Sequence, residues 1–494
     1  MRPWDFAIDL DSRAVTPLYA QLARGIAEAI RIGRLHPREP IPGTRDLAAR
    51  LEVHRNTVVA AYRELQSEGW IDTQRARGTF VSENLPERPI AHAATSSRGW
   101  GERVGFALPP HRDRHTSTPR KRGELSLQGG VPDTRLVPRA ALARAIRRAL
   151  RQGPVSLLDY GDPQGHPRLR AALATMLAQR RGMPLRAENV LVTRGSQMAL
   201  DLLARTLVAP GDRVAVESYG YRPAWEALRR AGAELVPIAV DADGLDVDAL
   251  ARAASRAPFR AVYVTPHHQY PSTVTMAPWR RIALLAWARA NRCVIIEDDY
   301  DHEFHYDGRP ILPLASADTA GLVVYIGTLS KLLAPGLRLG FAAAPESLVE
   351  RLATERVFVD RQGDAVFEAA IAEFMEEGEL QRHGRKMRRT YAARRDAMVD
   401  ALRREIGSAL AFDVPSGGLA LWARVADGID AEDWAARANE AGVLIASGRR
   451  FVFDRRAVPY LRVGFAAENE RDLREAVRRL SRTRPGGPIL RRPR

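Results

Sequence analysis

Residues 322–341, LVVYIGTLSKLLAPGLRLGF, place Lys331 just after a run of apolar and β-branched residues. The run LVVYIGT is typical of a buried strand. A lysine in an apolar setting loses proton affinity, and its free amine can then form a Schiff base with an aldehyde. The alternative is a lysine that extends from the end of the strand toward solvent.

The side chains around Lys331 favour the first interpretation. Thr328 and Ser330 offer hydroxyl groups, and the guanidinium fork of Arg338 suits a phosphate. The basic residues of the chain are overwhelmingly arginine, and the other lysines are Lys121 and Lys386. The segment therefore predicts a site for an aldehyde that carries a phosphate.

Similar strand-like runs alternate with helical patterns from about residue 125 onward. They are RVAVES at 213–218, ELVPIAV at 234–240, AVYVTP at 261–266, CVIIEDD at 293–299 and LVVYIGT at 322–328. Such alternation predicts an α/β domain with a largely parallel sheet. After about residue 345 helices dominate, and the strand candidates LALWARV and YLRVGF suggest a smaller C-terminal α+β lobe.

Other segments place polar groups where such a sheet binds ligands. Asp298, followed by Asp299 and Tyr300, ends a strand, and a carboxylate at this edge can keep a pyridinium nitrogen protonated. Gly195-Ser196-Gln197 opens an amphipathic helix whose free N–H groups suit a phosphate. Tyr221 follows another strand and can stack on a flat ring. The alternatives are solvated or helix-capping acids and a tyrosine in the core.

Residues 16–82 predict a compact helical unit followed by a hairpin. In PLYAQLARGIAEAI, apolar residues recur at the spacing of one helix face. Thr44 is expected to cap a second helix, and a third is expected from about Arg55 to Ser67. The segment WIDTQRARGTFVS alternates around a basic turn and predicts two strands and a wing.

This pattern is typical of a helix-turn-helix, whose second helix enters the major groove with its first residues at the base edges. Arginine is the commonest bidentate reader of guanine, Asn and Thr add hydrogen bonds, and wing arginines can enter the minor groove. The alternative for a basic triplet is a solvated surface. The candidate DNA-contacting residues are Arg45, His54, Arg55, Asn56, Thr57, Arg77, Gly78 and Thr79.

Composition is consistent with a DNA-binding protein of two domains. The 494 residues carry a formal net charge of +16, which fits a polyanion such as double-stranded DNA. We interpret 1–82 and 125–482 as domains, 83–124 as a linker and 483–494 as a disordered basic tail. No run approaches the roughly 18 apolar residues of a membrane span, and no signal-peptide run is present, so a cytoplasmic protein is expected. No metal site is predicted.

The N-terminal segment resembles the GntR-type winged helix-turn-helix. The resemblance rests on PLYAQLARGIAEAIRIGRL, IPGTRDLAARLEVHRNTVVAAYRELQSEGWI and RGTFV, which follow the family order. Gly43 stands where serine is usual, and Ala76 stands where a wing glycine is common. The resemblance implies that DNA is contacted by Arg45, Arg55, Thr57 and Gly78.

Residues from about 125 onward resemble fold-type I, aspartate-aminotransferase-like proteins, which bind pyridoxal 5'-phosphate. YGDPQGHPRLRAAL, VTRGSQMALDLL, TPHHQYPSTVTM, EDDYDHEF, TLSKLLAPGLRLGF and YLRVGFA occur in the family order. The resemblance implies that Lys331 forms the aldimine with the cofactor. It also implies that Asp298 partners the pyridine nitrogen and that Tyr300 donates a hydrogen bond to the phenolic oxygen.

The same resemblance implies the remaining contacts. Tyr221 would stack on the cofactor ring, and Arg462 would hold a substrate carboxylate. Ala420 stands where histidine is frequent, a departure that concerns the ligand rather than the cofactor. The phosphate would be bound by Ser196, Gln197, Thr328 and Arg338, with Tyr160 reaching it from the other subunit of a dimer.

A GntR-type head on such a domain is the arrangement of the MocR/GabR family of regulators, to which the whole chain is similar. This implies a head-to-tail homodimer whose DNA binding responds to pyridoxal phosphate, or to a small amine or amino acid that reacts at Lys331. The alternative is an active aminotransferase with an appended DNA-binding domain, because the lysine, aspartate and arginine that catalysis requires are all present.

Overall fold

The computed structural model describes residues 8, 10, 11, 14–74, 77–86, 106, 107, 120–308 and 311–486. The chain divides into two compact units, Met1–Ser117 and Thr118–Arg494. Two wing residues, Arg75 and Ala76, lie outside the described residues, as do most of the expected linker and the end of the basic tail. Among the described helices, none combines the length and the apolar character needed to cross a bilayer.

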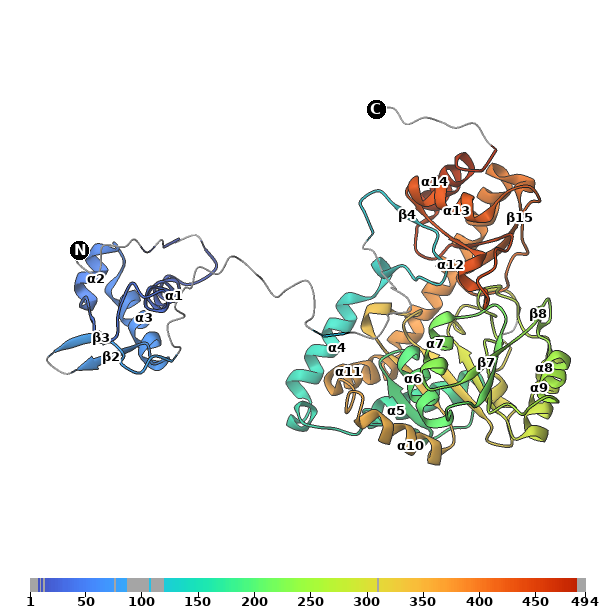
Figure 1. Cartoon of the computed structure of the whole chain (residues 1–494), viewed down its shortest axis with the longest axis horizontal. Coiled ribbons are helices and arrows are strands. Elements are labelled where there is room, and N and C mark those ends of the chain that lie inside the picture. The colour runs from blue at the N-terminus through green and yellow to red at the C-terminus, as the bar shows by residue number, and fades with distance from the viewer. Residues whose placement is uncertain are drawn as a thin grey trace. The chain divides into compact units, whose positions relative to one another are not determined.

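The described part of the N-terminal unit holds three helices and a three-stranded sheet, coloured blue in Figure 1. The hairpin of β2 and β3 is antiparallel, with Ile71 opposite Val81, and the short β1 pairs with β3. The predicted helices and wing strands are therefore confirmed. The elements are α1 (Leu18–Arg31), α2 (Thr44–Arg50), α3 (Arg55–Ser67), β1 (Pro40–Ile41), β2 (Ile71–Gln74) and β3 (Gly78–Val81).

One apolar cluster holds this unit together. Leu22 and Ile26 of α1 and Val58 and Leu65 of α3 are fully buried, and Leu47 of α2 is 2% exposed. These residues recur at intervals that place them on one face of each helix. Burial of each large apolar side chain contributes roughly 1.5–3 kcal/mol, so the packing fixes which face of α3 remains exposed.

The start of α2 differs from the prediction. Thr44 is the first residue of the helix rather than its cap, and Gly43 occupies the N-cap position with φ −62° and ψ 154°. The Thr44 hydroxyl instead accepts a long hydrogen bond from Nε of Arg55, at 3.5 Å. The prediction that Thr44 caps α2 was wrong, because Gly43 already supplies the extended backbone that precedes the helix.

A seven-stranded sheet forms the centre of the C-terminal unit (Figure 1). Its neighbouring strands are parallel except at β13, which runs antiparallel to both β5 and β12. All five predicted strands are present, and the short strands β5 and β13 were not predicted. The spatial order is β5 (Val190–Thr193), β13 (Gly340–Ala343), β12 (Val323–Thr328), β11 (Val294–Asp299), β10 (Ala261–Val264), β6 (Arg213–Glu217) and β7 (Glu234–Ile238).

Helices cover both faces of this sheet, because alternate residues of a strand point to opposite faces. Val214 and Val216 of β6 pack in one cluster with Leu203, whereas Ala215 packs in another cluster with Leu284. The first face is covered by α6 (Ser196–Leu207), α7 (Arg222–Arg230) and α10 (Glu346–Val357), and the second by α8 (Val247–Ala254) and α9 (Pro278–Asn291). This layering leaves the carboxyl ends of the parallel strands free to form a site.

The C-terminal part of this unit is a smaller α+β lobe, coloured orange to red in Figure 1 and confirming the predicted lobe. Its sheet has the order β14 (Leu410–Ala411), β15 (Ala420–Val425), β18 (Tyr460–Gly464) and β17 (Ala446–Ser447). Its helices are α12 (Glu379–Glu405), α13 (Ala431–Glu440) and α14 (Glu470–Arg482). Its sheet supplies side chains to the site described below.

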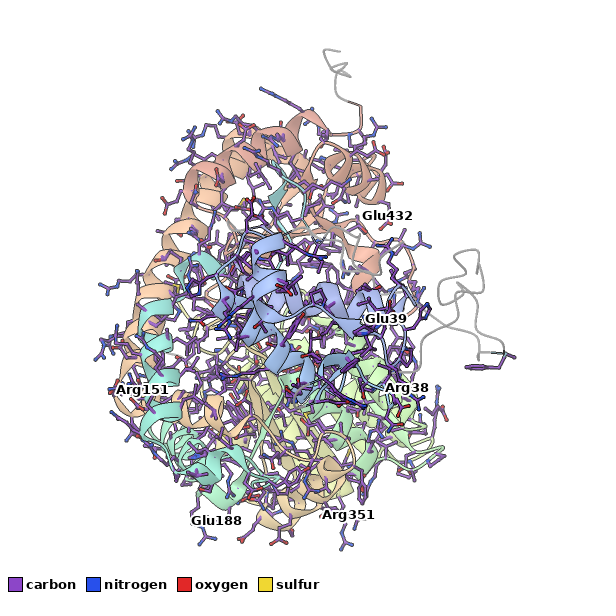
Figure 2. All side chains as sticks on the ribbon, turned by 90° about the vertical axis from the view of Figure 1, so that its left-hand side faces the viewer. Arg38, Glu39, Arg151, Glu188, Arg351 and Glu432 are labelled. Atoms are coloured by element: carbon purple, nitrogen blue, oxygen red, sulfur yellow. The ribbon has the colours of Figure 1, made fainter. Side chains whose placement is uncertain are left out.

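The remaining helices and strands complete the C-terminal unit. Figure 2 shows the charged side chains of Arg151, Glu188 and Arg351 projecting from its surface, where all three are exposed. These elements are α4 (Arg139–Gln152), α5 (Pro167–Arg181), α11 (Ala365–Glu376), the pair β4 (Leu125–Ser126) and β16 (Val443–Leu444), and the pair β8 (Val240–Asp241) and β9 (Gly244–Leu245).

Candidate functional site

A cavity opens where β10, β11 and β12 end. Because these strands are parallel neighbours, their carboxyl ends meet at one edge of the sheet and bring distant segments together. Five residues that the sequence predicted, Ser196, Tyr221, Asp298, Tyr300 and Lys331, lie in its wall. The full lining is Gly129, Gly130, Ser196, Tyr221, Tyr263, Thr265, Tyr270, Asp298, Tyr300 and Lys331.

Lys331 is the amine of this cavity. Burial, followed by the positive charge of Arg462, lowers the pKa of Lys331 to about 8. Gly130 of the cavity wall faces this amine, because a Cβ at Gly130 would lie 3.9 Å from the lysine Nζ. Near neutral pH, the unprotonated and nucleophilic fraction of this amine is therefore larger than that of an ordinary lysine.

Asp298 offers the cavity an unsatisfied carboxylate. Its Oδ2 accepts a hydrogen bond from the Tyr263 hydroxyl at 2.8 Å, whereas the buried Oδ1 has no partner among the described residues. Burial raises the pKa of Asp298 to about 7. The hydroxyl of Tyr300 is also buried without a partner in the described part of the chain. Both atoms need a polar ligand, since an unpaired buried polar group is costly.

Arg462 of β18 lies directly against Gly129 and Gly130 of the cavity wall. It is 1% exposed, its Nε has no partner among the described residues, and no ion pair with a described carboxylate neutralises it. The guanidinium carbon lies 4.4 Å from the centre of the Tyr270 ring. A side chain at Gly129 would clash with the guanidinium, so this glycine makes room for it. A buried cation of this kind is a site for a carboxylate.

The N-terminus of α6 provides a second anion site. Gly195 is its N-cap, with φ 82°, and no side chain caps the helix. The first N–H groups of a helix have no acceptor within it, and the helix dipole favours an anion there. Arg338 donates a hydrogen bond to the Arg194 carbonyl at 2.9 Å, and a Cβ at Gly195 would lie 3.0 Å from the same guanidinium nitrogen. The guanidinium therefore lies at this helix end.

Besides Arg338 and Arg462, which lie next to the cavity, three predicted site residues do not line it in this chain. Gln197 donates a hydrogen bond to the Pro223 carbonyl at 3.0 Å. The Thr328 hydroxyl donates to the Leu339 carbonyl at 3.2 Å, within the turn that carries the lysine. Tyr160 is 74% exposed, and its ring lies 4.0 Å from the guanidinium carbon of Arg361.

Several lining residues were missed by the sequence reasoning. Tyr263 and Tyr270 belong to AVYVTP and TPHHQYP, segments that were quoted only for their strand pattern or their order. Tyr270 packs edge-on against Tyr221, with ring centres 5.6 Å apart. Tyr263 could have been found from the alternation of its strand, but its bond to Asp298 depends on the pairing of β10 with β11.

The N-terminal unit presents the start of α3 to solvent. Arg55 and Asn56 are exposed, Thr57 is half-buried, and Arg45 is exposed on α2. His54 is the N-cap of α3, and its Nδ1 accepts a hydrogen bond from the Asn56 N–H at 3.2 Å. The cap therefore holds the first turn of α3 in shape.

The described part of the wing lies at the start of β3. Gly78 has φ 116°, a conformation that favours glycine. Arg77 is exposed, and the Thr79 and Thr73 hydroxyls lie 3.5 Å apart across the hairpin. The hairpin therefore presents Arg77 to solvent beside a turn that glycine makes possible.

Two family models match the chain. The model of aminotransferase class I and II matches residues 125–480, and the model of bacterial regulatory proteins of the gntR family matches residues 18–81. The cavity lies in the segment that the first model matches. The exposed start of α3 and the wing lie in the segment that the second one matches.

Individual relatives share both segments or only the aminotransferase-like segment. The probable rhizopine catabolism regulatory protein MocR of Rhizobium meliloti is 32% identical over 95% of this chain and 94% of its own length. The pyridoxine biosynthesis transcriptional regulator PdxR of Corynebacterium glutamicum is 33% identical, over 81% of this chain and 82% of its own. The α-aminoadipate aminotransferase LysN of Thermus thermophilus, solved with N-(5'-phosphopyridoxyl)-L-leucine, is 30% identical, with a TM-score of 0.68 over 73% of this chain and 92% of its own.

Proposed function

The chain belongs to the MocR/GabR family of transcription regulators, in which a GntR-type DNA-binding domain is joined to an aminotransferase-like domain, and we propose that it binds pyridoxal 5'-phosphate in the Lys331 cavity and couples this site to operator binding. The observation that carries the proposal is the set of unsatisfied buried groups around one cavity. Three of them are Oδ1 of Asp298, the Tyr300 hydroxyl and Nε of Arg462.

The residues present fit this cofactor. Lys331 has a lowered pKa and would hold the aldehyde carbon, and Asp298 would partner the ring nitrogen. Tyr300 would donate to the phenolic oxygen, and Tyr221 would pack against the ring. Ser196 and Arg338, at the N-terminus of α6, would receive the phosphate. When bound, the cofactor supplies an electron-withdrawing ring and an electrophilic carbon for amines.

Two predicted phosphate contacts, by Gln197 and Thr328, remain part of the proposal. Gln197 follows Ser196 in the chain, and Thr328 lies shortly before Lys331. A change of side-chain conformation would bring the polar atoms of Gln197 and Thr328 toward a bound phosphate. Tyr160 would reach the phosphate from the other subunit, which agrees with its outward position in one chain.

A second copy of the chain would cover the apolar side chains around Tyr160. Val155, Leu158 and Phe358 are 86%, 74% and 83% exposed. Gln362, close to Phe358 in the chain, donates to the Asp159 carbonyl at 3.5 Å, which places the two segments on one surface. Large exposed apolar patches mark protein interfaces. We therefore propose a homodimer, with the head-to-tail arrangement that the family resemblance implies.

The effector that fits the cavity is a small amine that carries a carboxylate. Arg462 would hold the carboxylate, and the amino group would meet the cofactor at Lys331. Binding there would change the affinity for DNA, and by linkage DNA would change the affinity for the effector by the same factor. The DNA would be read by residues 44–57 and the wing of the domain 1–82, joined through the linker 83–124 to the domain 125–482.

The test measures both sites in one titration. Full-length protein freed of cofactor would be mixed with fluorescent DNA from the region flanking its coding gene, and anisotropy would be followed as pyridoxal phosphate is added. We expect a change in DNA affinity that accompanies visible absorbance in wild-type protein and in Lys386→Ala. Lys331→Ala should show neither change. A DNA response that survives in Lys331→Ala would contradict the proposed coupling.

A second candidate function is aminotransferase activity. The observation in its favour is that Lys331 and Arg462 lie close together, and that the positive charge of Arg462 lowers the pKa of Lys331. Transfer of an amino group from an amino acid requires such a nucleophilic amine. Rapid release of keto acid with regeneration of the cofactor would favour the enzyme. Slow or single-turnover consumption of amino acid, together with altered DNA affinity, would favour the regulator.

A further inference from the structure

Four histidines gather beside the cofactor cavity in the segments that follow β10 and β11. His267 and His268 follow β10 and are 2% and 1% exposed, and His302 follows β11 and is 7% exposed. The ring of His267 lies 4.5 Å from that of His268 and 4.6 Å from that of His302, measured between centres. The half-buried His305 completes the group, with its ring centre 6.1 Å from that of His267.

The nitrogens of this group are largely unused. Both nitrogens of His267, Nε2 of His268 and Nε2 of His305 are buried and have no hydrogen-bond partner among the described residues. Unpartnered buried polar atoms are rare, and four of them in one place point to a ligand. One nitrogen from each of His267, His268 and His305 lies within 4.8 Å of the other two.

The surrounding acids orient and balance these imidazoles. Nδ1 of His268 lies 2.7 Å from Oδ1 of Asp301, which leaves Nε2 as the unpartnered nitrogen of this ring. A carboxylate on the far nitrogen is the usual support of a metal-bound histidine. Asp299 is a second buried carboxylate, and its Oδ2 accepts a hydrogen bond from the Tyr325 hydroxyl at 2.7 Å. Two carboxyl groups thus adjoin a set of imidazole nitrogen donors.

The C-terminal lobe leaves space at this point. Gly417 forms an isolated bridge with His305, and a side chain at Gly417 would clash with Nε2 of His268. The backbone of the lobe therefore closes over the histidines with a glycine. The histidines belong to the segments after β10 and after β11. They also contact the segment before β15, which contains Gly417.

We propose that His267, His268 and His305 bind one divalent transition-metal ion of the kind that prefers imidazole, with Zn²⁺ as the representative ion. Ca²⁺ and Mg²⁺ do not fit this site, because both ions select oxygen donors. A triad of His267, Asp299 and His302 also lies within reach, but there Oδ2 of Asp299 already lies 2.8 Å from Nδ1 of His302 and accepts a hydrogen bond from Tyr325. Three protein ligands leave a fourth position for water or a small ligand.

The proposed metal site does not depend on the proposed cofactor. It replaces the sequence-based expectation that the chain has no metal site. The pair His267-His268 and the pair His302 and His305 are 34 or more residues apart in the sequence, without a recognisable ligand spacing. Parallel pairing of β10 with β11 brings their following segments together. The metal would hold these two segments together. His305 would link them to the C-terminal lobe, because its backbone forms a bridge with Gly417.

The experiment uses full-length protein purified without a histidine tag and dialysed against a chelator. Zn²⁺ would be titrated against a chromophoric competitor, and thermal unfolding would be followed with and without the ion. We expect one Zn²⁺ per chain and a higher unfolding temperature, because an ion bound only to the folded state stabilises it. His267→Gln and His305→Gln should lose both effects, whereas the exposed His36→Gln should keep them.

Three controls keep the result decisive. His305 is only half-buried, so His305→Gln serves as the test if His267→Gln does not fold. Co²⁺ should give visible d–d bands in wild-type protein and not in His305→Gln. Both variants should keep the absorbance with pyridoxal phosphate, which separates this site from the cofactor site. Wild-type protein that retains no Zn²⁺ after desalting, or variants that bind Zn²⁺ as wild type does, would overturn the proposal.

Discussion

The Tyr263 hydroxyl donates to Oδ2 of Asp298 at 2.8 Å, and this single bond leaves Oδ1 as the free acceptor of the carboxylate. The tyrosine belongs to β10 and the aspartate to the neighbouring β11. The pairing of these two strands therefore sets the orientation of the Asp298 carboxylate. A positively charged ring nitrogen placed at Oδ1 would lower the pKa of Asp298 from its value of about 7 and keep the carboxylate ionised.

Replacing Asp298 with alanine should weaken the binding of pyridoxal phosphate. Loss of a charged hydrogen bond costs roughly 1.5–3 kcal/mol, which corresponds to about 10- to 100-fold in affinity. The measurement is a spectroscopic titration of cofactor-free protein. Asp248→Ala, which removes an exposed carboxylate from the start of α8, is the matched control. An unchanged affinity and spectrum in Asp298→Ala would assign the partner of the ring nitrogen to another acid.

The rate of cofactor capture should rise with pH through about 8. The folded protein holds the pKa of Lys331 at about 8, so the amine is mostly protonated below this pH and mostly free above it. An ordinary lysine, with a pKa near 10.4, would continue to gain free amine well beyond pH 9. Stopped-flow absorbance between pH 6.5 and 9.5 should therefore reach a plateau. A rate that still increases steeply at pH 9.5 would show that the lysine is not perturbed.

Replacing Arg462 with alanine should separate effector binding from cofactor binding. The variant loses the anion site for a carboxylate, so spectral responses to amino acids should weaken by roughly 10- to 100-fold, while pyridoxal phosphate still binds. The positive charge of Arg462 also lowers the pKa of Lys331, so its loss should move the midpoint of cofactor capture to higher pH. Equal responses to amino acids in wild type and variant would rule out this arginine as the carboxylate site.

Replacing Arg55 with alanine should cost roughly 1–3 kcal/mol of operator binding and relax discrimination at one base pair per half-site. Arg34, exposed after the end of α1, provides a control of the same charge, and Arg34→Ala should change affinity little. Both variants would be measured on operator and scrambled DNA at several salt concentrations. Similar losses for the two variants on both DNAs would mean that bulk charge, rather than the position of α3, accounts for binding.

Replacing Phe358 with glutamate should dissociate the proposed dimer. The side chain is 83% exposed in one chain, and a charge buried in an apolar interface is strongly unfavourable. Light scattering at micromolar concentration should give the mass of one chain for Phe358→Glu. Ile282→Glu, at another apolar position that is 70% exposed, should leave the dimer intact. A monomeric wild-type protein would contradict the dimer directly.

The sequence predicted those features whose cause is local. The bounds of α3, Arg55–Ser67, follow from apolar residues on one helix face, and the five long strands follow from β-branched runs. The strand β13, GFAA, contains no β-branched residue and gives no such signal. It forms because its two neighbours, β5 and β12, offer free edges on either side.

Some residues of the candidate site were predictable from the sequence, but their arrangement was not. The positions of Lys331 and Asp298 after strands indicated one edge of the sheet. The bond from Tyr263, the space left by Gly129 for Arg462 and the histidine group all depend on which segments become neighbours in three dimensions. No spacing along the chain carries that information.

The antiparallel pairing of β12 with β13 makes the segment between them a closed hairpin. Thr328 lies opposite Gly340, and both Lys331 and Arg338 lie on the short turn between these two residues. The amine and the guanidinium therefore belong to one connection between paired strands rather than to separate elements. An aldehyde that carries an anionic group at the matching distance would engage both ends of this one connection, whereas an aldehyde without such a group would engage one end only. An insertion in the connection would change the spacing of the two groups while leaving the pairing of the sheet unaltered.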